Sequence, residues 1–174
     1  MEFQLEQALE ILPRTPAVLR ALMHGLGEDW IQRNEGGASW SPHQVLGHLI
    51  HGEETDWIPR AKTILEHGPA RLFEPFDRFA MLKKFHDASV TDLLDLFAAW
   101  RHKNLEALAA MKLTPEKLQL RGRHPELGVV TLGQLLATWV VHDLSHLAQI
   151  SRVMCKQYQK AIGPWQAYFS IFKR

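Results

Sequence analysis

The chain has only one cysteine, Cys155, among its 174 residues, which excludes an internal disulfide. A single cysteine is typical of a protein from a reducing compartment, so we predict a cytoplasmic location. No apolar run approaches the roughly 20 residues that a membrane-spanning helix needs. The first residues contain glutamates and no basic residue, which is not the pattern of a secretory signal peptide.

The chain also lacks an excess of charge of one sign, because 20 basic residues oppose 19 acidic ones and the formal net charge is +1. This balance gives no electrostatic reason to expect a nucleic-acid or membrane-surface partner. The sequence contains no glycine-rich phosphate-binding loop and no serine in a nucleophile elbow. Without a repeat, a low-complexity tract or a linker, residues 1–174 are predicted to form one domain.

Four long helices are predicted from capping signals and apolar periodicity. Ser41 with Gln44 and Thr131 with Gln134 have the pattern of capping boxes at the start of two of them. Pro59 is expected to kink the second helix, because it removes one backbone hydrogen bond. The predicted helices cover residues 15–34, 41–67, 89–111 and 131–157.

The shorter segments complete a predicted all-α architecture, a four-helix bundle with short additional helices in the connections. Thr15 is predicted to cap the first long helix, and residues 77–86 to form a short helix. Residues 118–120 and 128–130 are predicted to pair as two small strands. The aromatic tail, residues 157–174, is predicted to pack as a last turn or short helix.

Two histidines, His142 and His146, lie four residues apart in the fourth predicted helix. Residues at this spacing stand on the same face of a helix, so two imidazoles can bind one metal ion. At about 100° per residue, the pair flanks the apolar stripe, as side chains that line a cleft do. A third histidine would give the three-ligand arrangement of catalytic zinc. The alternative is a chance pairing, since the chain has ten histidines.

The second predicted helix contains the candidates for the third ligand. His48 and His51 are the competitors, and spacing alone does not choose between them. Glu53 and Glu54 lie at about 140° and −120° from His48, so they are predicted to be solvated charges rather than ligands or bases. Cys155 points away from the histidine pair and is predicted to be neither a ligand nor a nucleophile.

Five further residues are predicted to lie around the site. Gly52, at about 40° from His48, leaves room beside the imidazole, and Thr55 lies at about −20°. Trp139 is next to the histidine pair and either walls a pocket or packs in the core. Asp143 falls within the apolar stripe, where a carboxylate must be paired, and Arg101 is its predicted partner.

Several short motifs of the chain together resemble one known family. They are Thr15-Pro16, Trp40-Ser41-Pro42, Gly47-His48-Leu49, Trp100-Arg101, His124-Pro125-Glu126-Leu127-Gly128 with Thr131-Leu132, and His142-Asp143-Leu144-Ser145-His146-Leu147-Ala148-Gln149-Ile150. Their order and spacing resemble the DinB superfamily, metal-binding four-helix bundles named after a damage-inducible bacterial protein, over nearly the whole length. The family's ligands are one histidine on the second helix and two, four apart, on the last long helix. The resemblance therefore implies His48, His142 and His146.

The resemblance also implies a class of chemistry. Characterised members include thiol-dependent S-transferases and isomerases, and many others are described as metal-dependent hydrolases. We therefore expect a metalloenzyme, a thiol-dependent S-transferase or a hydrolase, that acts on a small molecule. Imidazole ligands suit zinc, nickel, iron or manganese, and a transferase would also use a low-molecular-weight thiol. No residue is assigned as the general base.

A second hypothesis is a non-catalytic helical module, such as a stress-response or dimerising protein with a structural or vestigial metal site. A structural zinc site is closed by four protein ligands, whereas the sequence offers three good candidates. This count favours an open site. A homodimer is compatible with both hypotheses, and neither calls for a nucleic-acid or membrane partner.

Overall fold

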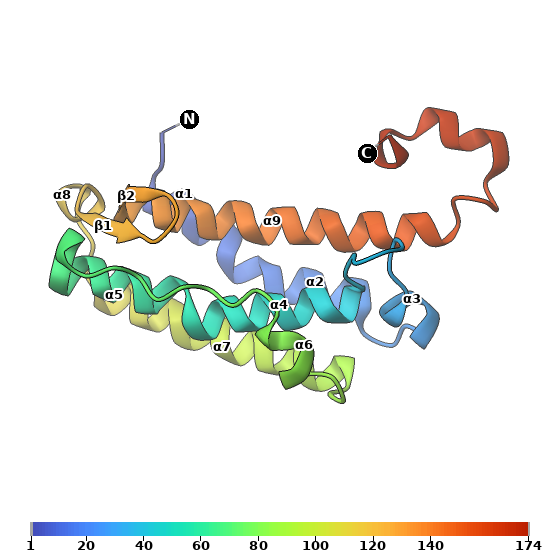
Figure 1. Ribbon diagram of the computed structural model, residues 1–174, viewed down its shortest axis with the longest axis horizontal. Helices are drawn as coiled ribbons and strands as arrows, with labels where there is room; N and C mark the ends of the chain where they lie inside the picture. The colour runs from blue at the N-terminus through green and yellow to red at the C-terminus, as the bar shows by residue number, and fades with distance from the viewer. Residues whose placement is uncertain (1, 174) are drawn as a thin grey trace.

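The structure of the protein, a computed structural model, describes residues 2–173 and is a bundle of four long helical segments (Figure 1). Its α-helices are α1 Leu5–Ile11, α2 Thr15–Met23, α3 Glu28–Gln32, α4 Pro42–Thr55, α5 Trp57–His67, α6 Ala80–Lys84, α7 Val90–Ala110, α8 Pro115–Leu118 and α9 Leu132–Gln157. Short 3-10 helices cover Leu12–Arg14, Gly68–Ala70, Gly163–Tyr168 and Ser170–Phe172. The four segments are α1–α2, α4–α5, α7 and α9, so the predicted four-helix bundle with short connecting helices is confirmed.

Both predicted capping boxes form. The Ser41 hydroxyl accepts a hydrogen bond from the Gln44 backbone N–H, and the Gln44 side-chain oxygen accepts one from Ser41. Thr131 and Gln134 make the same reciprocal pair at the start of α9. These bonds satisfy backbone donors that the first helical turn leaves without partners, which fixes where α4 and α9 begin.

The second long segment is interrupted at Asp56, which separates α4 from α5. A proline ring clashes with the carbonyl group four residues earlier, and for Pro59 that group belongs to Thr55, the last residue of α4. The predicted kink is therefore present, as a break between two helices. Both parts continue along the bundle, so α4 and α5 together line one side of α9 (Figure 1).

The first predicted helix, residues 15–34, begins where α2 begins but extends too far, and α2 is the continuation of an earlier helical segment. The helical segment begins ten residues earlier, at Leu5, and Thr15 has helical backbone angles instead of capping a helix. Its hydroxyl donates to the Asp143 carboxylate at 2.7 Å. The segment stops at Met23 because Gly25 has a φ of 78°, and a separate turn, α3, follows. Glycine adopts positive φ without the steric cost that other residues have.

The small strand pair exists: its second strand begins at residue 128 as predicted, and its first strand begins three residues later than predicted. β1 Arg121–His124 and β2 Gly128–Thr131 form an antiparallel hairpin, with Arg121 opposite Thr131. The tail after α9 forms two 3-10 helices, as short as expected, but Trp165 and Tyr168 are 66% and 81% exposed instead of packed. Within residues 2–173, no helix has the length and apolar character needed to cross a membrane.

The core has two apolar clusters separated by a polar layer. One cluster surrounds α2, the first part of α4 and Phe97 of α7, and the other surrounds α1, α5 and Trp139 of α9. Between them, α4, α7 and α9 contribute Glu53, Arg101 and Asp143, each at most 1% exposed. Glu53 directly follows Gly52 in the sequence, and Asp143 directly follows His142. The polar layer therefore sets the relative positions of α4 and α9 at the candidate site.

Gly122 gives a direct test of how the hairpin packs on the bundle. A Cβ atom at this position would lie 2.6 Å from Ile64 and 2.7 Å from Phe73, closer than real contacts allow. We expect Gly122→Ala to lower the free energy of unfolding by about 1–3 kcal/mol, measured by urea denaturation. Gly27→Ser, at a helix N-cap with open space around it, should be neutral or slightly stabilising. An unchanged stability of Gly122→Ala would contradict this packing.

Candidate metal centre

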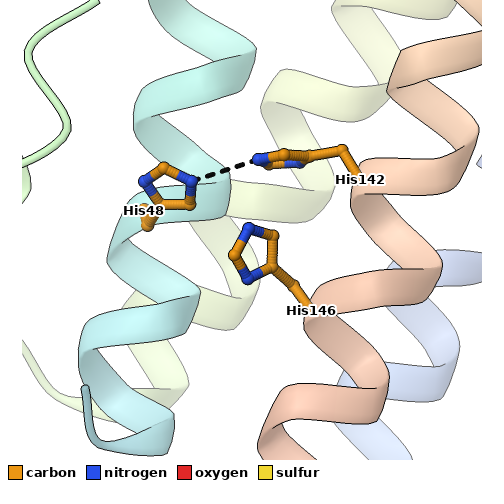
Figure 2. Close-up of side chains that lie close together, drawn as sticks. All are labelled: His48, His142 and His146. Carbon is orange, nitrogen blue, oxygen red and sulfur yellow. Dashed lines mark hydrogen bonds between the residues drawn. The ribbon is translucent and has the colours of Figure 1, made fainter. Parts of the chain in front are cut away.

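Three histidines from two helices meet in the bundle. His48 lies on α4, His142 and His146 lie one turn apart on α9, and their rings point into the space between the two helices (Figure 2). The Nε2 atoms of His48 and His142 are 3.1 Å apart, and one ligand nitrogen from each ring lies within 4.8 Å of the others. Nitrogens around a tetrahedral zinc ion are about 3.4 Å apart, so small ring rotations suffice for binding.

One of the three rings has the outer hydrogen bond that is typical of a metal ligand. Nδ1 of His146 lies 2.7 Å from the Gln149 side-chain oxygen and donates to it, which leaves Nε2 with its lone pair. This is the outer hydrogen bond that orients a metal-ligating imidazole. The buried Nδ1 atoms of His48 and His142 have no hydrogen-bond partner among residues 2–173. Those two rings are held by packing against Trp40 and Trp57.

Burial keeps all three imidazoles neutral. It lowers the pKa of His48 to about 3 and that of His142 to about 2, and repulsion from the neighbouring histidines adds to both shifts. The pKa of His146 is also lowered, mainly by burial, although its bond to Gln149 and the nearby Asp143 carboxylate oppose the shift. A neutral imidazole has the lone pair that a metal ion needs, so the site is ready for a metal at neutral pH.

These pKa shifts predict how the stability of the metal-free protein depends on pH. The unfolded chain protonates His48 and His142 near pH 6.5, and the folded chain protonates them only near pH 2–3, so stability falls as the pH drops through this window. Each proton that the unfolded chain binds and the folded chain does not changes the free energy of unfolding by about 1.4 kcal/mol per pH unit. Asp56 has the opposite effect on stability, because burial raises its pKa to about 6. The histidines outnumber this single carboxyl, so the net stability still falls as the pH decreases.

The measurement is the urea midpoint in the presence of a chelator between pH 7 and pH 4.5. We expect a steady decrease, with a shallower slope in His142→Leu, which removes one of the protons. Equal midpoints at pH 7 and pH 5 would show that the histidines are accessible to protons in the folded state.

A pocket of about 540 Å³ opens beside the three histidines. Trp40, Trp57 and Phe76 form apolar walls of the pocket beside the three histidines. Gly52 lines it as predicted, since a Cβ there would lie 3.8 Å from the His142 ring. The pocket therefore gives a small molecule a route to the ring nitrogens.

A buried ion network lies behind the site. Arg101 donates to both oxygens of Asp143 at 2.7 and 3.0 Å and to Glu53 at 2.8 Å. Trp139 and Asn104 also donate to Glu53. The prediction that Arg101 pairs with Asp143 is confirmed. The prediction that Glu53 is a solvated charge was wrong, because α7 and α9 cover the side of α4 from which it projects.

Other predicted residues lie outside the pocket. Thr55 is exposed and its hydroxyl donates to the His51 carbonyl, and Trp139 is stacked behind Trp57 at 5.8 Å. His51 packs against Phe76 and does not join the three histidines. Glu54 pairs with a lysine instead of being free in solvent, while Cys155 is exposed.

Some residues that line the pocket could not be predicted from sequence patterns. Phe76 and Arg78 lie in an irregular segment without periodicity, and both line the pocket. Asp56 and Arg60 also line it, paired at 2.5 Å across the break between α4 and α5. Gln149 was within reach of sequence reasoning, since it follows His146 by three residues and so shares its helix face.

Comparisons with known proteins identify one similar sequence and two similar solved structures. A protein of Oceanobacillus iheyensis described as a "putative metal-dependent hydrolase" is 25% identical over 150 residues, 86% of this chain and 83% of that protein. YfiT of Bacillus subtilis, described as a probable metal-dependent hydrolase with an unusual four-helix bundle topology, matches with a TM-score of 0.73 at 20% identity, covering 91% of this chain and 87% of YfiT.

A second solved structure, the four-helix bundle protein TT2238, matches with a TM-score of 0.58 at 21% identity, covering 85% of this chain and 98% of TT2238. At these identities the structural matches establish the fold alone. The family is established by the sequence, because the profile of the DinB superfamily matches residues 11–150, most of the bundle and all three histidines. The chain therefore belongs to the DinB superfamily.

Proposed function

We propose that His48, His142 and His146 bind one divalent metal ion, and that the protein is a metalloenzyme acting on a small molecule. The observation that carries this proposal is the convergence of three neutral imidazoles at the wall of an apolar pocket. Imidazole nitrogen suits zinc, nickel, iron and manganese, so the ligands alone do not select the metal. The names of the two metal-dependent hydrolase relatives support the same direction.

The reaction that fits this site is hydrolysis or the transfer of a low-molecular-weight thiol. When bound, the ion supplies Lewis-acid chemistry, because it lowers the pKa of a water or thiol or polarises a carbonyl group. Trp40, Trp57 and Phe76 exclude bulk water from the ring nitrogens, and Gln149 holds His146 in the tautomer with a free Nε2. His48, His142 and His146 are the ligands in this proposal, and they leave coordination positions for the reacting molecule.

The alternative is a structural site, and the ligand count separates the two. A structural zinc ion has four protein ligands. Within residues 2–173, no further histidine, cysteine, aspartate or glutamate joins the group of three. An ion held by these histidines therefore keeps an exchangeable position, which favours chemistry over structure.

The test is metal analysis of untagged protein followed by spectroscopy of the cobalt-substituted form. We expect one metal ion per chain, and a change in the visible spectrum on adding 2-mercaptoethanol, because sulfur enters the coordination sphere. Azide should alter the spectrum as well if the open position accepts small anions. A chain that binds metal with a spectrum unaffected by thiol and azide is closed by a fourth ligand, and the structural alternative then replaces the catalytic one.

A further inference from the structure

The pocket has two ends of different character. Trp40, Trp57 and Phe76 pack against the histidines at one end, with ring-centroid distances of 4.9 Å from Trp40 to His48 and 5.4 Å from Phe76 to His48. Phe73 and His124 lie at the other end, where the hairpin covers α5. An apolar group fits the histidine end, because aromatic rings form its walls.

Arg78 is the cation of the histidine end, and its charge is not neutralised by the protein. The guanidinium carbon lies 5.3 Å from the ring centres of Trp40 and Phe79. Among residues 2–173, no carboxylate pairs with Arg78 and no acceptor takes a hydrogen bond from it. Arg78 lines the same pocket as the three histidines.

The other charges around the pocket do not serve the same role. Asp56 and Arg60 pair with each other, and Arg60 also lies 5.3 Å from the Phe73 ring. Glu126 belongs to the hairpin end, where its charge raises the pKa of His124 against the stronger effects of burial and Arg60. The histidine end therefore has an unopposed positive charge beside neutral rings and aromatic walls.

We propose that Arg78 binds the carboxylate of a small organic acid whose apolar body lies against Trp40 and Phe76. The cation–π contacts with Trp40 and Phe79 position the exposed guanidinium and leave its N–H groups free for a bidentate carboxylate. The reacting group of such a molecule then lies at the three histidines; this placement rests on the proposed metal site. Recognition of the carboxylate by Arg78 does not need the metal.

The experiment compares two probes of the same shape, 3-phenylpropionate and its neutral amide, 3-phenylpropionamide. Binding is followed by tryptophan fluorescence, because Trp40 and Trp57 line the pocket, and by ligand-observed NMR. It is measured for the wild type, Arg78→Met, Arg78→Lys and Arg71→Met, each in a metal-free and a zinc-loaded state. Arg71 is exposed in the same irregular segment but does not line the pocket. Arg71→Met is therefore the control, because it removes the same charge without changing the pocket.

In the metal-free wild type we expect the acid to bind about tenfold more tightly than the amide. Arg78→Met should remove this preference while the amide binds as before, and Arg71→Met should keep it. Arg78→Lys should retain only part, because an ammonium lacks the planar fork of the guanidinium. These results together would support the assignment.

Three outcomes would overturn it. The wild type binds acid and amide equally, Arg78→Met keeps the preference, or the preference exists only with zinc and survives in Arg78→Met. The last result means that the metal, not Arg78, holds the carboxylate. Failure of the proposed metal site looks different, because the chain then binds no stoichiometric zinc while the Arg78-dependent preference persists.

Discussion

His142→Ala should abolish stoichiometric binding of a divalent metal. Its Nε2 atom lies 3.1 Å from that of His48, so the substitution removes one of three ligands and leaves two nitrogens on different helices. The loss should exceed the roughly 10- to 100-fold reduction in affinity that follows from losing an outer hydrogen-bond partner alone. The measurement is zinc content after dialysis against buffered zinc, with circular dichroism to verify the helical fold.

The matched control is His51→Ala on the same helix as His48. His51 is buried but packs on Phe76, outside the group of three. Its variant should retain one metal ion per chain. Gln149→Leu should lie between the two, with metal bound about 10- to 100-fold more weakly, since His146 loses the acceptor of its Nδ1 hydrogen. Full metal content in His142→Ala, or loss of it in His51→Ala, would refute the assignment.

The histidine pattern was accessible to sequence reasoning because it depends on local geometry. A spacing of four residues fixes the relation of His142 to His146 once a helix is recognised, and the capping box at Thr131 and Gln134 fixes where that helix starts. The position of the third ligand depends on how two helices pack. Periodicity alone did not choose between His48 and His51 as the third ligand. The resemblance to the family selected His48, and in the structure His48 lies beside His142 and His146.

Glu53 shows where single-helix reasoning fails. Its angle from His48 predicts exposure to solvent only if α4 has one buried and one exposed face. In the structure α4 is covered on several sides, and eleven of its fourteen residues are buried. A helix that is enclosed in this way carries some polar side chains inward. The hydrogen bonds that Glu53 accepts from Arg101, Asn104 and Trp139 compensate for its burial.

Phe76 and Arg78 could not be predicted for a different reason. They lie in the segment between α5 and α6, which has neither helical nor strand periodicity. The path of such a segment depends on tertiary contacts, such as the backbone bond from Phe73 to Arg123 of the hairpin. The wall of the pocket is therefore less predictable from sequence than the ligands at its base.

Arg101→Met should cause the largest loss of stability among the variants considered. Arg101 is 1% exposed and neutralises two carboxylates, those of Glu53 and Asp143, that are equally buried. The surrounding charges raise the pKa of Arg101 despite its burial, so it is charged in the folded protein. Without it, two carboxylates face each other in the core, and we expect a loss of about 3–5 kcal/mol in the free energy of unfolding.

Urea denaturation measures this loss, and Arg20→Met is the matched control. Arg20 pairs with Asp95 on the surface, with side chains 40% and 66% exposed, so its removal should cost less than about 1 kcal/mol. Added salt should weaken the Arg20 contribution and leave that of Arg101 nearly unchanged, because water and ions do not reach the buried network. A loss below about 1 kcal/mol in Arg101→Met would contradict a charged, buried network.

A triple variant then separates the cost of unpaired charge from the value of the network. Replacing a whole buried ion pair by apolar residues is often neutral or stabilising. Here Thr15, Asn104 and Trp139 also donate to the two carboxylates. Glu53→Met, Arg101→Met and Asp143→Leu together would therefore leave Thr15 and Trp139 without their acceptors, and Asn104 with only its bond to the backbone carbonyl of residue 53. We expect the triple variant to be more stable than Arg101→Met and less stable than the wild type. A triple variant as unstable as Arg101→Met would mean that lost packing, not unpaired charge, causes the loss.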